Sequence, residues 1–166
     1  MPAEQQTGQP AASIRIVEAH EPAHLSAIIA LFEDYAASLD ISLDFQGFDA
    51  ELAALPGDYQ PPRGCLLLAL VDGRPAGCVA MRPLGPGICE MKRLYVRPAF
   101  RGLSLGRLLV GEVCEQARRA GHAAMRLDTL PSMAGALAVY RSSGFRDIAP
   151  YCFNPHAGAV FLEKTL

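Results

Sequence analysis

Apolar residues recur along the chain with two different periods, which predicts that strands and helices alternate. Ser13–Glu18 alternates apolar and polar side chains and indicates a first strand. Apolar residues at helical spacing then predict a helix over Pro22–Leu39, with Pro22 in its first turn. A shorter helix is predicted over Asp49–Leu55, ended by Pro56-Gly57.

Three consecutive strands are predicted in the middle of the chain. The apolar run Cys65–Val71 is typical of a buried strand, and Asp72-Gly73 is a hairpin turn signal before the returning strand Pro75–Met81. After a turn at Pro83–Gly87, Ile88–Val96 predicts the third strand of an antiparallel meander.

The second half of the chain predicts a parallel strand pair. A helix from about Leu105 to Ala120 separates Ile88–Val96 from the predicted strand Ala124–Asp128. A strand, loop, helix and strand in direct succession favour parallel pairing of the two strands. The remaining predicted elements are a helix over Met133–Ser143 and strands over Arg146–Tyr151 and Ala159–Glu163. This order predicts an α/β fold with a mixed, mostly antiparallel sheet.

Length and charge limit the function classes. The 166 residues suit one domain, predicted over residues 13–166, after a disordered leader over residues 1–12. A net charge of −2 and a pI near 6.1 predict neither a nucleic-acid partner nor a membrane partner. The longest apolar run, Cys65–Val71, is too short to span a bilayer.

Cysteine and histidine spacing predicts no metal site. The 5 cysteines are an odd number without a Cys-x-x-Cys pair, and the 4 histidines are scattered. Reduced thiols of this kind are typical of a cytoplasmic protein.

The stretch Leu94–Leu109 carries the main functional signal. It begins as a strand, breaks at Pro98 and passes through a glycine-containing loop, Arg101–Gly106, into an amphipathic helix. Such a loop directs backbone N–H groups and the positive end of the helix dipole at one point, which favours phosphate. The stretch lacks the Gly-Lys-Ser/Thr ending of a P-loop and the three glycines of a dinucleotide fingerprint.

Residues 96–106, VRPAFRGLSLG, resemble motif A of the GNAT-type N-acetyltransferases, V-x-P-x-x-R-G-x-G-x-G. Ser104 stands where the middle glycine is usual. The resemblance implies an acyl-CoA N-acyltransferase fold with a splayed parallel strand pair and helices on both sheet faces. It also implies that strand backbone and loop amides bind acetyl-coenzyme A (acetyl-CoA). The implied cofactor-binding residues are Leu94, Tyr95, Val96, Arg101, Gly102, Leu103, Ser104, Leu105, Gly106 and Arg107.

Residues 136–145, ALAVYRSSGF, resemble the second landmark of that family, A-x-x-x-Y-x-x-x-G-F. The resemblance implies that Tyr140 is a general acid, because a phenol can donate a proton to the departing thiolate. Met133 replaces an asparagine that many relatives carry near the pantetheine arm, and a thioether cannot supply the donor and acceptor of an amide.

A base is expected because only a neutral amine attacks a thioester. Glu90 is the first candidate, since acidic residues early in this strand act as bases in some relatives, and Asp128 is the second. Strand alternation predicts that Glu90, Leu94 and Val96 share one face, unless a bulge intervenes. The alternative for Glu90 is an ion pair with Lys92 or Arg93, or a charge at the rim of the site.

The acceptor is predicted to be a small-molecule amine or amino acid. In relatives it lies against segments that correspond to Asp34–Tyr59 and Tyr151–Gly158. Acidic and aromatic residues there favour a cationic amine, whereas Arg63, Arg93 and Arg141 favour a carboxylate, and both alternatives stay open. A homodimer is compatible with the sequence, although no pattern specifies one.

These features predict an acetyl-CoA-dependent N-acetyltransferase that acts by direct attack in a ternary complex. The second hypothesis is a non-catalytic acyl-CoA-binding or regulatory module of the same fold, which the changes at Ser104 and Met133 keep open. The third is a nucleotide-binding domain of another class.

Overall fold

The computed structural model describes residues 10–166. Most of the predicted leader therefore lies outside the described residues. Residues 10–12 are exposed and have no regular secondary structure. The first strand, β1 (Ile14–Glu18), follows directly, one residue later than predicted.

A seven-stranded sheet forms the centre of the molecule, in the order β1-β2-β3-β4-β5-β7-β6. Only the β4–β5 pair is parallel, and the other neighbouring strands are antiparallel. The sequence prediction of a mixed, mostly antiparallel sheet is thus confirmed. The strands after β1 are β2 (Cys65–Val71), β3 (Arg74–Gly85), β4 (Ile88–Val96), β5 (Ala124–Thr129), β6 (Arg146–Asp147) and β7 (Val160–Thr165).

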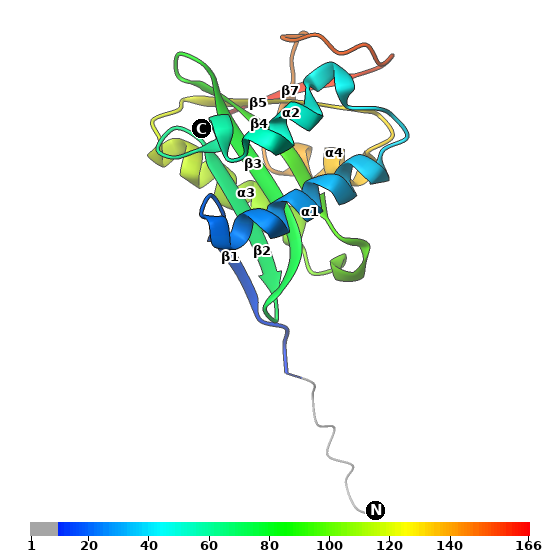
Figure 1. The fold of residues 1–166 in the computed structure, drawn as a ribbon. Helices are drawn as coiled ribbons and strands as arrows, with labels where there is room; N and C mark the ends of the chain where they lie inside the picture. The colour runs from blue at the N-terminus through cyan, green and yellow to red at the C-terminus, as the bar shows by residue number, and fades with distance from the viewer. Residues whose placement is uncertain (1–9) are drawn as a thin grey trace, which may run out of the picture.

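Helices cover both faces of this sheet (Figure 1). On one face lie α1 (Pro22–Ser38) and α2 (Phe48–Ala54), and on the other lie α3 (Leu105–Arg119) and α4 (Ala134–Ser142). Short 3₁₀ turns occupy Asp44–Gln46, Gly57–Tyr59 and Pro98–Phe100.

Each face of the sheet has its own hydrophobic core. Ile28 and Phe32 of α1 pack with Leu66 and Leu68 of β2, and all four are almost fully buried. The opposite core buries the apolar stripe of α3 together with side chains of β2, β3, β4 and β5. Burying each large apolar side chain stabilises the fold by about 1.5–3 kcal/mol, so the two cores hold the sheet between its helices.

Local signals explain the accurate boundaries and also the two largest errors. Asp72 and Gly73 both have positive φ, 49° and 78°, as a tight hairpin requires, and β2 begins and ends where predicted. The predicted turn over Pro83–Gly87 was wrong at its start, because β3 continues to Gly85. The predicted strand Arg146–Tyr151 was also wrong, because β6 ends at Asp147.

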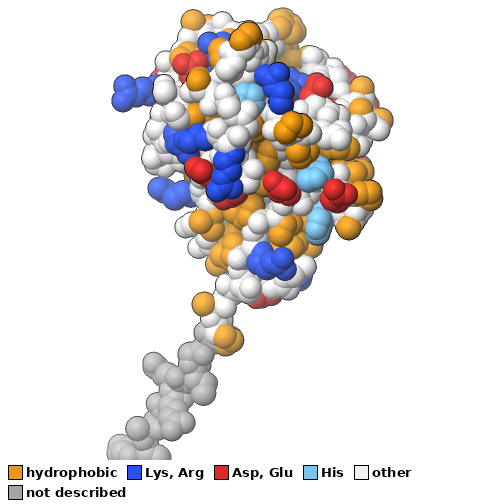
Figure 2. Space-filling model, turned by 90° about the vertical axis from the view of Figure 1, so that its left-hand side faces the viewer, with side chains coloured by type: hydrophobic (Ala, Val, Ile, Leu, Met, Phe, Trp, Pro, Cys, Tyr) orange, Lys and Arg blue, Asp and Glu red, His pale blue; other side chains and the backbone are white. Residues whose placement is uncertain are grey.

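The face of the molecule shown in Figure 2 carries basic, acidic and apolar side chains intermixed. Among residues 10–166, no helix has both the length and the hydrophobicity required to cross a bilayer.

Candidate active site

The parallel strands β4 and β5 separate partway along their length. They pair over Ile88–Glu90 and Ala124–Arg126, yet β4 continues to Val96 and β5 to Thr129. Backbone groups of β4 beyond Glu90 therefore have no β5 partner on that side, and a gap opens through the sheet. The splayed parallel pair is thus present as the family resemblance implied.

A bulge in β4 reverses the side-chain alternation before this gap widens. The β3–β4 register shifts between Cys78 and Ala80, and Arg93 has a φ of 62°. Glu90 consequently lies on the α1 side of the sheet, whereas Leu94 and Val96 pack against the α3 side. The prediction that these three residues share one face was wrong, because it assumed an unbroken strand.

The loop between β4 and α3 leads directly into the N-terminus of α3 and contains two residues with positive φ. Gly102 has a φ of 92° and Ser104, the residue before α3, has a φ of 60° and a ψ of 26°. Ser104 thus adopts the left-handed conformation in which glycine is usual. In the described part of the chain, no side chain caps the N-terminus of α3, so its first N–H groups are available to an anion.

An open groove of about 460 Å³ adjoins this loop. The end of β4 forms one wall and the first turn of α4 forms another, with Met133 and Gly135 among the α4-side residues. Of the predicted cofactor-binding residues, the structure brings Leu94, Tyr95, Val96, Arg101 and Gly106 to the groove. Leu103 and Arg107 are exposed beside it, whereas the side chain of Leu105 is buried in a small core with Phe100.

A smaller cavity of about 30 Å³ continues from the groove into the gap between β4 and β5. Tyr35 of α1, Leu94 and Met133 line both spaces. The Met133 sulfur accepts a hydrogen bond from the Thr129 hydroxyl at 3.5 Å, so this side chain links β5 to the start of α4.

Tyr140 extends from α4 into this smaller cavity. It is 6% exposed, and its ring packs edge-on against Phe145 at a centroid distance of 5.9 Å. Burial, with smaller contributions from Tyr35 and Asp128, raises the pKa of the Tyr140 hydroxyl well above its ordinary value. The hydroxyl is therefore protonated at neutral pH, as a general acid must be.

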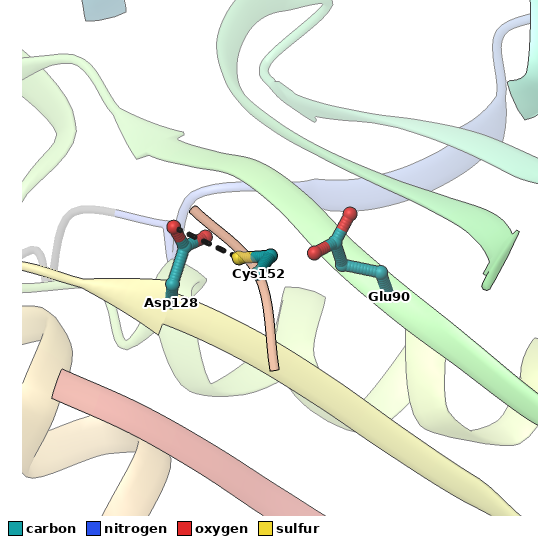
Figure 3. A group of neighbouring side chains, drawn as sticks. All are labelled: Glu90, Asp128 and Cys152. Carbon is teal, nitrogen blue, oxygen red and sulfur yellow. Dashed lines mark hydrogen bonds between the residues drawn. The ribbon is translucent and has the colours of Figure 1, made fainter. Parts of the chain in front are cut away.

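Glu90 and Asp128 face each other across the gap, from β4 and β5 respectively (Figure 3). Glu90 is 2% exposed, and both of its oxygens are engaged. Arg82 binds Oε1 through Nε at 3.0 Å and Nη2 at 2.9 Å, and the Tyr151 hydroxyl donates to Oε2 at 2.6 Å. Glu90 thus forms an ion pair, but its partner is the cross-strand neighbour Arg82 and not Lys92 or Arg93, so the predicted partner was wrong.

Asp128 is half-buried and has one oxygen free of hydrogen bonds among the described residues. Its Oδ2 accepts from Asn154 Nδ2 at 3.1 Å and lies 3.8 Å from the Cys152 sulfur. Asp128 also raises the pKa of Tyr140, Tyr35 and Tyr151, although burial is the largest cause in each case. Asp128 lines the same small cavity as Tyr35 and Tyr140.

The segment Pro150–Gly158, here called the strap, crosses the gap on the side of the sheet that carries α1 and α2. This side of the gap is called the acceptor side below. Tyr151 binds Glu90, and Asn154 binds Asp128. Phe153 and His156 lie edge-on to Phe45, with ring centroids at 6.5 and 5.4 Å. These contacts explain why β6 is short, because the chain leaves the sheet to reach the two carboxylates.

Lys92 and Arg93 both converge on Gln46 from β4. The Lys92 ammonium donates to Gln46 Oε1 at 3.2 Å, and Arg93 Nη1 donates to the same oxygen at 2.7 Å. Arg93 also forms a bidentate ion pair with Glu51 of α2, at 2.9 and 3.1 Å. Of the three arginines considered for a substrate carboxylate, only Arg93 lines the gap, and Arg141 pairs with Asp147 instead.

Glu90, Asp128 and Cys152 offer ligand atoms within 4.8 Å of one another, which is close enough to consider a cation. Both Glu90 oxygens are already engaged, however, by Arg82 and Tyr151, and Asn154 occupies one of the two Asp128 oxygens. A cation bound to Glu90 would have to displace Arg82 or Tyr151, so the cluster is better described as a hydrogen-bonded anchor for the strap.

Sequence reasoning missed several residues of the gap. Patterns within single elements carry no signal for cross-sheet contacts such as Arg82–Glu90 or Tyr151–Glu90. Polar positions inside apolar strands provide a usable signal, because a buried charge must find a partner. The segments Asp34–Tyr59 and Tyr151–Gly158 were expected near the acceptor, but only the structure identifies the contacting residues in them, which are Tyr35, Gln46, Tyr151 and Asn154. Arg82 was not foreseen at all, and Lys92 was considered only as a partner of Glu90.

The sequence matches the model of the acetyltransferase (GNAT) family over residues 28–145. An uncharacterised N-acetyltransferase of Schizosaccharomyces pombe is 42% identical over 144 residues, covering 86% of this chain and 88% of that protein. An acetyltransferase from Streptococcus agalactiae superposes with a TM-score of 0.74 at 23% identity, over 92% of this chain and 98% of that one. The PaiA N-acetyltransferase of Thermoplasma acidophilum, solved in complex with coenzyme A, superposes with a TM-score of 0.72 at 17% identity, covering 93% of this chain and 99% of that one.

Proposed function

Because this chain belongs to the acetyltransferase (GNAT) family, we propose that it transfers the acetyl group of acetyl-CoA to the primary amine of a small molecule. The transfer occurs by direct attack within a ternary complex. The gap between β4 and β5 is the observation that carries this proposal, because it joins Tyr140 and Asp128 to the groove beside the phosphate loop.

The residues present fit acetyl-CoA. The groove of about 460 Å³ is open at its α3 end, where uncapped N–H groups favour an anion such as a pyrophosphate. The β4 backbone from Leu94 to Val96 has no β5 partner and is available to pair with amides of the pantetheine arm. Loop residues Arg101–Arg107 hold the phosphate end in this proposal.

When bound, acetyl-CoA supplies an activated acetyl thioester. Tyr140 provides the acid, because its hydroxyl keeps its proton at neutral pH and faces the junction of groove and gap. Backbone N–H groups of the separated β4 segment can stabilise negative charge on the thioester oxygen.

Two carboxylates are candidates for the base. The structure favours Asp128 over Glu90, although Glu90 is the first candidate from the sequence. Both oxygens of Glu90 accept hydrogen bonds from Arg82 and Tyr151, whereas Asp128 keeps an oxygen that no described residue binds. In this proposal Asp128 accepts the amine proton, and Glu90 positions the strap.

A thermal-shift experiment with acetyl-CoA, CoA, ATP and NAD in parallel tests the cofactor. A ligand at one hundred times its dissociation constant adds about 2.7 kcal/mol, which corresponds to roughly 5–10 °C at this chain length. We expect shifts with acetyl-CoA and CoA only. A folded sample without either shift would contradict the proposal.

Release of free CoA thiol in the presence of an amine panel tests the transfer. Release of CoA that depends on an amine would support the proposed N-acetyltransferase activity. Acetyl-CoA binding without turnover of any amine would instead support a non-catalytic acyl-CoA-binding module.

A further inference from the structure

The part of the gap that faces α1 and the strap contains one cationic and one anionic side chain for which the described residues provide no ion pair within 4.0 Å. Glu90 is paired with Arg82, and Arg93 with Glu51. Within residues 10–166, no ion pair shorter than 4.0 Å involves the two other charged groups that line the cavity, Lys92 and Asp128. The side chains that hydrogen-bond to Lys92 and Asp128 are those of Gln46, Cys152 and Asn154.

Lys92 is 8% exposed and has a single acceptor, the neutral Gln46 Oε1 at 3.2 Å. An ammonium group carries three N–H donors, so two are left without an acceptor from the described residues. Burial lowers the pKa of Lys92, and the nearby Glu90 carboxylate partly counteracts this effect. An anion bound in the cavity would supply the missing acceptor and offset the cost of burying this charge.

Asp128 has the complementary deficit. Its Oδ2 receives the Asn154 amide, and its second oxygen receives no donor from the described residues. Asp128 and Tyr140, whose hydroxyl acts as the acid in our proposal, line the same small cavity, and Asp128 contributes to the raised pKa of Tyr140. An ammonium or amine held by Asp128 is therefore close to the place where the leaving thiolate is protonated.

From this juxtaposition we propose that the acceptor is a zwitterionic amino acid, with its carboxylate on Lys92 and its amine on Asp128. The inference rests on the proposed function and specifies the acceptor of that reaction. The cavity of about 30 Å³ accommodates few atoms of the substrate. The enzyme therefore recognises the amine, the carboxylate and the short link between them. The remainder of the amino acid lies towards the strap and Phe45.

The proton balance follows from these positions. The ammonium group of the bound zwitterion first loses one proton to solvent, and the resulting neutral amine forms the new C–N bond as the C–S bond of the acetyl thioester breaks. The amine proton passes to Asp128, and the departing thiolate takes the proton of the Tyr140 hydroxyl. Solvent returns a proton from Asp128 to Tyr140, so the products are an N-acetylamino acid and free CoA.

The first experiment compares matched acceptors. The twenty standard amino acids and β-alanine are tested with saturating acetyl-CoA, and CoA release is measured. The best substrate is then compared with its own carboxamide and its decarboxylated amine. Because a site built for a carboxylate leaves a buried cation unpaired with either analogue, we expect kcat/KM to fall roughly 100-fold for both.

The second experiment tests Lys92 directly. We expect Lys92→Met to lower kcat/KM for the amino acid about 100-fold and that for its carboxamide less than threefold. Lys164→Met is the matched control, because Lys164 is the other lysine of the chain and lies at the far end of β7 from the gap. The acetyl-CoA thermal shift should survive in both variants, which verifies that each is folded.

Three results would overturn the inference. These are equal turnover of the amino acid and its carboxamide, an equal loss for both acceptors in Lys92→Met, and acetyl-CoA binding without turnover of any amino acid. Failure of the wild-type protein to bind acetyl-CoA would contradict the proposed function itself, so the two failures are distinguishable.

Discussion

The hydroxyl of Tyr151 donates a hydrogen bond of 2.6 Å to Oε2 of Glu90, and this bond ties the strap to the central strand β4. The two residues are 61 positions apart in the sequence. Because the acceptor is a charged oxygen, such a bond is stronger than one between neutral groups. Access to the acceptor side of the gap therefore depends on how firmly the strap is held.

We expect Tyr151→Phe to lower the free energy of unfolding by about 1.5–3 kcal/mol and to raise KM for the acceptor, while the acetyl-CoA dissociation constant changes little. Urea denaturation and initial-rate kinetics measure these quantities. Tyr59→Phe is the matched control, since Tyr59 donates a comparable bond of 2.8 Å to Glu51 away from the strap. A KM change of equal size in both variants would contradict a specific role for the strap.

Tyr140→Phe removes only the proposed acid. The ring and its contact with Phe145 persist, so we expect unchanged stability and acetyl-CoA affinity. The value of kcat should fall about 100-fold, which is typical for loss of a general acid. Full activity of this variant would show that another donor, such as water, protonates the thiolate.

Asp128→Asn and Glu90→Gln separate the two carboxylates. We expect Asp128→Asn to reduce kcat/KM roughly 100-fold with little loss of stability, because its proposed role is proton acceptance. Glu90→Gln should lower the free energy of unfolding by about 3–5 kcal/mol, since it leaves Arg82 without its buried partner. Kinetics and urea denaturation on the same samples decide between them, and the reverse pattern would identify Glu90 as the base.

Ser104→Gly tests the one departure from the phosphate-loop motif. Ser104 has a φ of 60°, a conformation that costs a non-glycine residue about 1 kcal/mol. We expect the melting temperature to rise by about 2–4 °C and the acetyl-CoA dissociation constant to change less than tenfold. Ser104→Ala is the control, because alanine retains the backbone cost. A larger gain in affinity would mean that serine impairs the natural loop.

The protein should lose stability in alkaline solution. Burial raises the pKa of the Cys65 and Cys89 thiols to about 12, whereas unfolded cysteine ionises near about 8.5. Above about pH 9 the unfolded state therefore binds fewer protons than the folded state, and the free energy of unfolding falls as pH rises. The lowered pKa of Lys92 makes the free energy of unfolding rise with pH, but this is one group, whereas both Cys65 and Cys89 lower it.

Urea denaturation at pH 7 and pH 10 under reducing conditions measures this dependence. Cys89→Ala should flatten the slope, because it removes one of the thiols that ionise only on unfolding. Equal stability at the two pH values would contradict the burial of these groups.

Much of the fold could be predicted because its signals are local. Cys65–Val71 and Ile88–Val96 have the predicted bounds, since each strand ends beside a turn that glycine or proline marks. The parallel pair also followed from local order, because a strand, loop, helix and strand leave few other topologies. Motif A placed the phosphate loop for the same reason.

The acceptor side could not be predicted, because its contacts join distant segments. Tyr151 reaches Glu90, and Lys92 reaches Gln46 across 46 residues. The bulge at Arg93 also has no sequence marker, since a positive φ at arginine is unusual. Predictions of individual roles for Tyr140, Glu90 and the loop residues stay predictions until the variants above are measured.

The bulge at Arg93 reverses the side-chain alternation within β4, so odd-numbered and even-numbered residues exchange sheet faces at this point. Residues before it present their charged side chains to α1 and α2, and residues after it present apolar side chains to α3. Deleting Arg93 would restore regular alternation with Leu94 and Val96 still on the α3 side. It would, however, remove the contacts of Arg93 with Gln46 and Glu51. In a systematic substitution scan of β4, tolerated and sensitive positions should accordingly alternate, with this alternation interrupted at Arg93.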